Sequence, residues 1–145
     1  MRSLRLGALS AGLWAGILIC IGLIAAPAPF ATLASADAGR VVSRIFAQEA
    51  YLSLALAVVL FLIVRKQAKM AAAAGTGSIV NANVLLVLGT LFCTVAGYFA
   101  VQPMLEAARA GQGRFSFGAL HGASMAFFAL KGLLVLVLAW RLGNR

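Results

Sequence analysis

Three ionisable side chains lie in or beside long apolar stretches, where they could do chemistry. Lys131 lies near the middle of the last stretch, Phe117 to Trp140, and His121, the chain's single histidine, lies near its start. Glu49 stands where an earlier apolar run begins. A lysine at the bilayer centre costs about 2.5–3.5 kcal/mol on insertion scales, so it needs a protein partner, water or a route to the surface. Ionisable residues at such depth usually mark a path for ions, protons or substrates.

These side chains predict a polar pocket inside a helix bundle. His121, Ser124 and Lys131 fall on one broad helical face, which should turn inward. Lys131 lies about 15 Å deeper than His121 at helical rise, so depth favours His121 as the partner of Glu49. A bond from Glu49 to Lys131 would need the full reach of the lysine or a bridging water. The predicted pocket residues are Glu49, Gln102, His121, Ser124 and Lys131.

Simpler interpretations exist for each of these residues. A single histidine at a helix start is more often a hydrogen-bonding group at the rim than a ligand. Glu49 can lie among the headgroups, paired with Arg40 or Arg44. Lys131 can reach water through a crevice. A structure decides between these alternatives by showing whether the side chains converge.

Composition places the chain in a membrane. Hydrophobic residues make up 63% and charged residues 10% of the 145 residues, and the mean hydropathy is +1.04. A soluble domain carries about a quarter charged residues. The net charge of +9 comes mostly from basic residues at the ends of apolar segments, which indicates membrane topology. We therefore expect the lipid bilayer as a partner and no nucleic acid.

The apolar segments predict an all-α integral membrane bundle, one domain over residues 1–145. Pro27 and Pro103 should end the first and third helices, and Ser35 or Asp37 should cap the second. That helix should be extended at its start by an amphipathic outer segment over 38–48 and be followed by a flexible linker over 66–78. The four predicted spans cover residues 6–28, 47–65, 80–102 and 118–140.

Small residues at four-residue spacing indicate close helix packing. The pattern recurs in the first, third and fourth helices, and it makes the first and third helices candidates for packing against each other. Cys20 and Cys93 continue the spacing and are interpreted as packing residues. The glycines assigned to packing are Gly12, Gly16, Gly89, Gly97, Gly118 and Gly122.

The distribution of basic residues orients the four spans. Seven basic residues share the side with both termini: Arg2, Arg5, Arg65, Lys66, Lys69, Arg141 and Arg145. The opposite side has four: Arg40, Arg44, Arg109 and Arg114. Since Lys and Arg are enriched on the cytoplasmic side, both termini should be cytoplasmic. The predicted location is the cell membrane, with the bacterial inner membrane as the expected one.

A series of short motifs across the whole chain resembles the transmembrane protein 205-like family. They are Trp14-x-Gly16, the Ala-Pro-Ala-Pro-Phe30 exit, Ala38-Gly-Arg-Val-Val-Ser-Arg-Ile-Phe46, Gln102-Pro103 and His121-Gly-Ala-Ser124. The resemblance implies a four-helix membrane protein, with bacterial members largely of unknown function and an animal relative linked to platinum resistance. The chain departs from the animal pattern at Gln102, Met125 and Phe128, so platinum handling is not carried over.

Three functions from different classes follow. The first is a membrane protein that binds or moves a small molecule or ion through the polar pocket, with a homo-oligomer as an expected assembly. The second is a non-catalytic helper or structural subunit that docks to another membrane protein. The third, less favoured, is a haem or redox protein, for which the single histidine offers no two-histidine ligand set. We expect no enzyme, metal site or cofactor, because no nucleophile has a neighbouring base and no phosphate loop is present.

Overall fold

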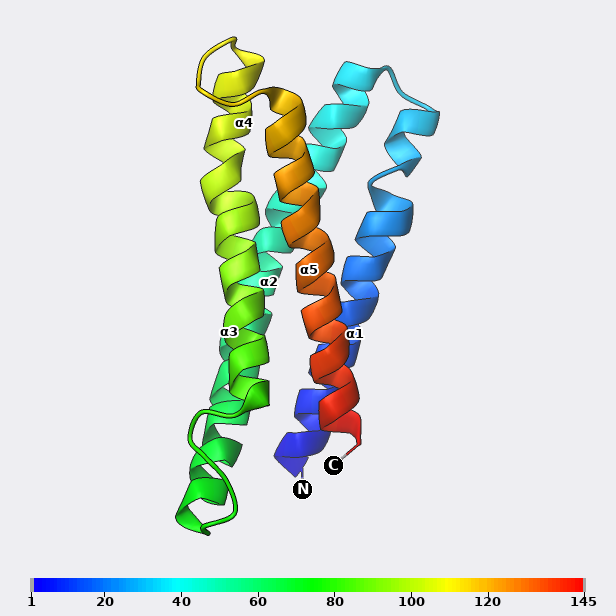
Figure 1. The fold of residues 1–145 in the computed structure, drawn as a ribbon. Coiled ribbons are helices and arrows are strands. Elements are labelled where there is room, and N and C mark those ends of the chain that lie inside the picture. Colours follow the sequence, from blue (N-terminus) through cyan, green and yellow to red (C-terminus); the bar gives the residue numbers. More distant parts are fainter. Residues whose placement is uncertain (1, 145) are drawn as a thin grey trace.

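A computed structural model describes residues 2–144, and the regular structure in this range is all helical, with no strand (Figure 1). The first segment comprises α1 (Arg2–Cys20), the π-helix η1 (Ile21–Ala25) and the 3-10 helix η2 (Ala28–Ala31). Next come α2 (Ser35–Ala73), α3 (Ala82–Thr94), the π-helix η3 (Val95–Ala100), α4 (Val101–Arg109) and α5 (Phe117–Gly143).

Four of the helical segments are long and apolar enough to cross a membrane: Ser3–Thr32, Ser35–Ala73, Ala82–Arg109 and Phe117–Gly143. Their surfaces carry many exposed large apolar side chains, as expected where lipid replaces water. The predicted all-α bundle of four spanning helices is confirmed. The start of α1 and the end of α5 lie at the same end of the bundle (Figure 1), which we call the terminal end; the opposite end is the distal end.

The helices form a closed ring in which each packs against two neighbours. α1 packs against α2 and α5, and α3 packs against the same two helices. The pairs α1/α3 and α2/α5 therefore lie on the diagonals, and the expected packing of the first helix against the third is wrong. α2 and α5 both begin at the distal end and run in the same direction (Figure 1). Side chains that join α2 and α5 must consequently reach through the centre of the bundle.

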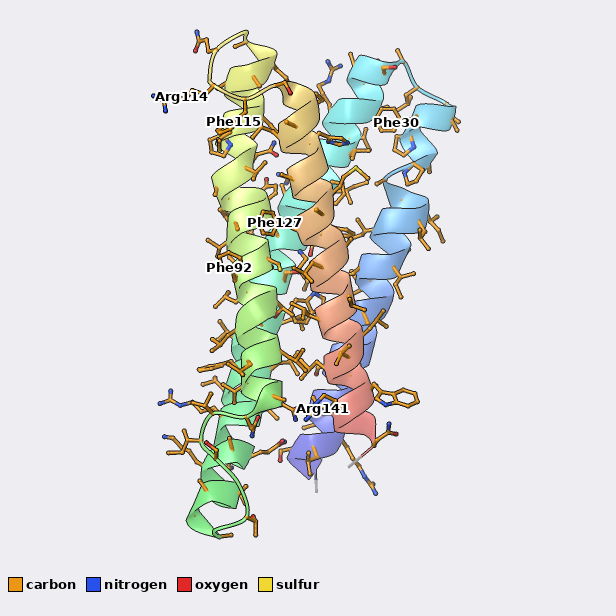
Figure 2. All side chains as sticks on the ribbon, viewed as in Figure 1. Phe30, Phe92, Arg114, Phe115, Phe127 and Arg141 are labelled. Atoms are coloured by element: carbon orange, nitrogen blue, oxygen red, sulfur yellow. The ribbon has the colours of Figure 1, made fainter. Side chains whose placement is uncertain are left out.

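The main core fills the terminal half. It is built from residues of α1, α2, α3 and α5 that are almost completely buried, including Trp14, Leu60, Val87 and Leu138. A polar bond closes the same end: the Arg141 Nε of α5 donates to the Asn83 Oδ1 of α3 at 2.8 Å, and Figure 2 shows Arg141 at this end. Among residues 2–144, the distal half holds a small apolar cluster of α4 and α5.

Several helix boundaries differ from the sequence predictions. Pro103 does not end the third helix, since α4 runs on to Arg109. The preceding π-helix η3 changes the hydrogen-bond register, so the missing N–H of Pro103 falls where the helix restarts. Likewise α2 extends to Ala73 and takes up the first part of the expected linker. Neither Ser35 nor Asp37 caps it: Ala34 is the N-cap residue, without a side-chain bond, and Asp37 pairs with Arg40.

The glycines play two different roles. A Cβ at Gly97 would lie 2.6 Å from the Cβ of Phe127, and one at Gly89 would lie 3.1 Å from Leu134, so both of these glycines let α5 approach closely. In contrast, the remaining predicted packing glycines are exposed, with open space where a Cβ would stand: Gly12, Gly16, Gly118 and Gly122. Within the single chain these four do not mediate packing.

Candidate functional site

A buried ion pair joins the diagonal helices α2 and α5. The Nζ of Lys131 lies 2.6 Å from the Oε1 of Glu49 and donates a hydrogen bond to it. The two residues are only 3% and 4% exposed. Because the backbones of α2 and α5 do not contact each other, the long lysine side chain bridges the centre of the bundle. The structure therefore pairs Glu49 with Lys131 and not with His121.

Two further side chains complete the cluster. The Ser53 hydroxyl donates a hydrogen bond to Oε1 of Glu49 and accepts one from Nε1 of Trp14 at 3.0 Å. The Nζ of Lys131 also lies 3.4 Å from the same hydroxyl. We call Trp14, Glu49, Ser53 and Lys131 the ion-pair cluster. Three helices thus contribute to it, and every polar group that the indole and the hydroxyl bring into the core has a partner.

Helical periodicity explains how α2 presents its part of the cluster. Glu49 and Ser53 are four residues apart and so lie on one face, which continues into the buried Ala57 and Leu60 of the core. On α5, Lys131 lies on the face of the buried Val135 and Leu138. Glu49 and Lys131 thus each lie at the distal end of a row of buried apolar residues on their helix. The cluster marks the border between the tightly packed terminal half and the more open distal half.

An aromatic pair covers the distal side of the cluster. Phe46 and Phe128 each precede a member of the ion pair by three residues, and their rings meet edge to face with centroids 5.2 Å apart. The Nζ of Lys131 lies 5.3 Å from the centroid of Phe128, within the range of a cation–π interaction. The ring both shields the ammonium group and offers it partial electrostatic compensation.

Helix α3 adds polar side chains whose hydroxyl groups donate hydrogen bonds to backbone carbonyls of α3 itself. The Thr90 hydroxyl donates to the carbonyl of Val87 at 2.7 Å, and the Thr94 hydroxyl donates to the carbonyl of Thr90 at 2.9 Å. Neither threonine makes an interhelical bond among the described residues. No group of three or more His, Cys, Asp or Glu gathers in residues 2–144 that could hold a metal ion.

The other predicted pocket residues lie apart from the ion pair. Ser124 donates to the carbonyl of Gly97 at 3.1 Å and so ties α5 to the π-helix η3. His121 is exposed and stacks on Phe117, with ring centroids 5.8 Å apart. Gln102 is half-buried and makes no hydrogen bond with its side chain in the described range. Of the five predicted residues, the structure brings together Glu49 and Lys131.

Sequence reasoning missed Trp14 and Ser53. The sequence pattern marks Trp14 only as part of the Trp14-x-Gly16 motif, and in the structure this residue is completely buried. A buried indole usually needs an acceptor for its N–H, so a tryptophan far from a helix end was a signal that a polar partner lay opposite. Ser53 is one helical turn from Glu49, which is the spacing at which a hydroxyl reaches a carboxylate.

The geometry limits what the cluster can do. Both protein bonds to the carboxylate end on Oε1, so Oε2 has no protein donor in the described part of the chain. The pair is neutral as a whole and lies out of water, where removing one charge leaves the other uncompensated. A proton or a charged ligand can therefore enter only by an exchange that keeps the site neutral. Such an exchange is the chemistry of binding and relay sites inside membranes.

Ser53→Ala tests whether the hydroxyl holds the cluster together. The change leaves the Trp14 N–H buried without an acceptor, and we expect it to lower the free energy of unfolding by about 1–3 kcal/mol. Detergent-induced unfolding of the purified protein in mixed micelles measures this. Ser43→Ala on the same helix is the matched control, because the Ser43 hydroxyl makes no hydrogen bond among the described residues. Equal losses in both variants would show that the Ser53 bonds contribute nothing.

Comparison with known proteins gives one family match. A family model described as a domain of unknown function (DUF4149) matches residues 9–114. This range contains Trp14, Glu49 and Ser53, whereas Lys131 lies beyond it. No curated protein matches the chain. No solved structure matches it.

Proposed function

Since the chain belongs to the DUF4149 family, a family of unknown function, we propose a function from the ion-pair cluster itself. The protein binds a small molecule or ion at Glu49 and Lys131 and moves it across the membrane. Neither residue is a catalytic residue in this proposal, because no substrate bond is broken. The site works by exchanging the partner of a buried charge.

The observation that carries the proposal is the position of the ion pair in the centre of the bundle. Each charge lost its hydration when it was buried, and the pairing recovers that cost only partly. Replacing a buried pair by apolar residues is often neutral or stabilising, so a bundle with this core would fold without it. A charged pair across the diagonal at 2.6 Å therefore supports a role beyond stability.

The proposed setting is the bacterial inner membrane, with both termini cytoplasmic. The excess of basic residues at the terminal end supports this orientation, which puts the distal end outside. The motifs described above also support a relationship to the transmembrane protein 205-like family. We propose that relationship for the architecture alone, because the polar positions of the animal pattern differ here.

The proposal is tested by flux through proteoliposomes. The change Glu49→Gln/Lys131→Leu removes both charges together and is expected to preserve the fold. Gradients of chloride or potassium are imposed, and ion-selective electrodes follow the release of each ion, because acetic acid and ammonia cross a bare bilayer unaided. We expect wild-type protein to speed the loss of at least one gradient, while the double variant matches empty liposomes. Equal rates for wild type and double variant would contradict the proposal.

A helper or structural role is the second candidate. It is favoured by the exposed glycine faces of α1 and α5, where no atom lies within 4 Å of a Cβ built at Gly12, Gly16, Gly118 or Gly122. Another helix could approach closely there. In this case the double variant would keep full function, and a partner would co-purify with it in the same amount as with wild type.

A further inference from the structure

The ion-pair cluster borders almost completely buried residues on its terminal side and half-buried residues on its distal side, and this difference suggests what it binds. We propose that the site takes up a small anion together with one proton, from the distal end, past a gate formed by Phe46 and Phe128. This inference rests on the proposed function and specifies its ligand class, route and pH dependence.

Packing around the cluster is unequal. On the terminal side, α2 and α5 continue into residues that are almost completely buried, among them Leu60, Val64 and Leu138. On the distal side, α2 has no buried residue between Ala38 and Glu49. Similarly, α5 has none between Leu120 and Lys131. A ligand approaching from the terminal end would have to part the main core, so the distal end offers the easier route.

Phe46 and Phe128 occupy this route one helical turn before the ion pair. Their rings are in contact across the diagonal, and both residues are only half-buried. A Cβ built at Gly22 would lie 3.2 Å from Cε1 of Phe128, so the glycine leaves room for the ring beside α1. Rotation of the two phenyl rings, with small adjustments of the adjoining helices, would open a path to the ion pair. The pair therefore fits the role of a side-chain gate.

Two π-helices flank the gate. η1 places Gly22 against Phe128 on one side of α5, and η3 places Gly97 against Phe127 on the other. In Figure 2, Phe127 lies at this middle level of α5. π-Helical turns have altered hydrogen bonding and are frequent at functional sites. The helical segments on both sides of α5 thus have irregular backbone hydrogen bonding at the level of the gate. This irregularity allows small backbone adjustments there.

Charge at the distal end favours anions. A cleft there is lined by the guanidinium-bearing Arg40 of α2 and Arg109 of α4, together with Ser35, Ala36, Gly39 and Ser43, and it has no acidic lining residue. Arg40 pairs with the exposed Asp37, whereas Arg109 lies over the ring of Phe117 and has no acidic partner among the described residues. The whole end carries four arginines against Asp37 and Glu106. This excess of positive charge raises the local concentration of anions and repels cations.

Neutrality of the buried site then requires a proton. An anion that pairs with the Lys131 ammonium displaces the Glu49 carboxylate, which would remain as an uncompensated buried charge. One proton taken up by Glu49 restores neutrality: a carboxylate and an ammonium become a carboxylic acid and an ammonium–anion pair. The titratable side chains that act on this exchange are Glu49 of α2, Lys131 of α5 and the nearby Cys93 of α3. From α1 the cluster receives the uncharged Trp14.

Trp14 provides a built-in reporter, because its indole N–H bonds the hydroxyl that bonds Glu49. Trp140→Phe removes the second tryptophan, which is exposed at the end of α5. Full-length protein in nanodiscs is titrated with sodium acetate at constant ionic strength, at several pH values, and indole fluorescence is followed. We expect apparent affinity to rise about tenfold for each unit by which pH falls, since one proton accompanies each anion. Tetramethylammonium is the matched cationic probe and should cause no response.

Substitutions separate proton uptake by Glu49, anion binding at Lys131 and passage of the gate. In Glu49→Gln, which mimics the protonated acid, acetate should bind with no pH dependence, whereas Lys131→Gln in the same background should abolish the response. Phe46→Ala should speed the response several-fold in stopped flow and leave the equilibrium affinity unchanged. A response to tetramethylammonium, or an acetate response independent of pH in the parent protein, would overturn this inference and leave the proposed function standing. No response to either probe, together with absent flux in liposomes, would overturn both.

Discussion

Lys131→Leu is expected to leave membrane insertion intact and to destabilise the folded bundle by about 3–5 kcal/mol. Leucine is far cheaper than lysine at the bilayer centre, so insertion itself should improve. The folded state, however, then contains the Glu49 carboxylate without its cation, only 4% exposed and held by the single bond from Ser53. Unfolding by sodium dodecyl sulfate in mixed micelles measures the loss.

The double change Glu49→Gln/Lys131→Leu is the matched control. It removes both charges, and replacing a buried ion pair by neutral groups is often close to neutral for stability. We therefore expect the double variant to recover most of the stability lost by Lys131→Leu. If the single variant were as stable as wild type, the Glu49 carboxylate would have to reach water once unpaired. The two residues would then not form a coupled unit.

The number and class of the helices could be predicted from the sequence because they depend on local properties. Apolar length and the scarcity of charge fix the spanning segments, and these do not depend on how the helices pack. Proline was a less reliable guide. The helical segment of α1 ends at the turn around Pro27, as expected, but α4 passes through Pro103 because a π-helix precedes it. The change in hydrogen-bond register that admits this proline has no clear signal in the sequence.

The partners in the site depend on helix order and register, which are global properties. Depth counted from the starts of the predicted spans, residues 47 and 118, favoured His121 for Glu49. In the structure, Glu49 and Lys131 each lie fourteen residues after the first residue of their helix, Ser35 and Phe117. In the structure, Phe46–Phe128 and Glu49–Lys131 share one separation in sequence, since α2 and α5 run parallel on the diagonal. The long distal extension of α2 sets that register, and it brings Glu49 to the level of Lys131. A lysine also leans toward the start of its helix, which shortens the gap.

Small residues were recognised correctly as contact points only where a neighbour in the same chain faces them. Gly89 and Gly97 face α5, whereas Gly12, Gly16, Gly118 and Gly122 have the same spacing and face outward. Spacing defines a face of a helix but does not say what lies opposite it. The structure makes that distinction, and it separates glycines whose substitution must disturb the fold from glycines whose substitution should not.

Gly97→Val is expected to destabilise the bundle by at least about 3 kcal/mol, at the upper end of the cost of overpacking. The added Cβ would stand 2.6 Å from the Cβ of Phe127, which is fixed to the α5 backbone and cannot rotate away. α3 and α5 must then separate, which also strains the bond from Ser124 to the Gly97 carbonyl. Unfolding in mixed micelles measures the effect, as for Lys131.

Gly122→Val is the matched control for Gly97→Val, because it makes the same change on α5 at a position with no atom within 4 Å of the new Cβ. It should change stability by less than about 1 kcal/mol, the scale of helix propensity. Equal stability of the two variants would mean that η3 yields to the larger side chain. In that case the contact between η3 and α5 would be plastic, and the irregular turn beside the gate would be able to move as the proposed anion route requires.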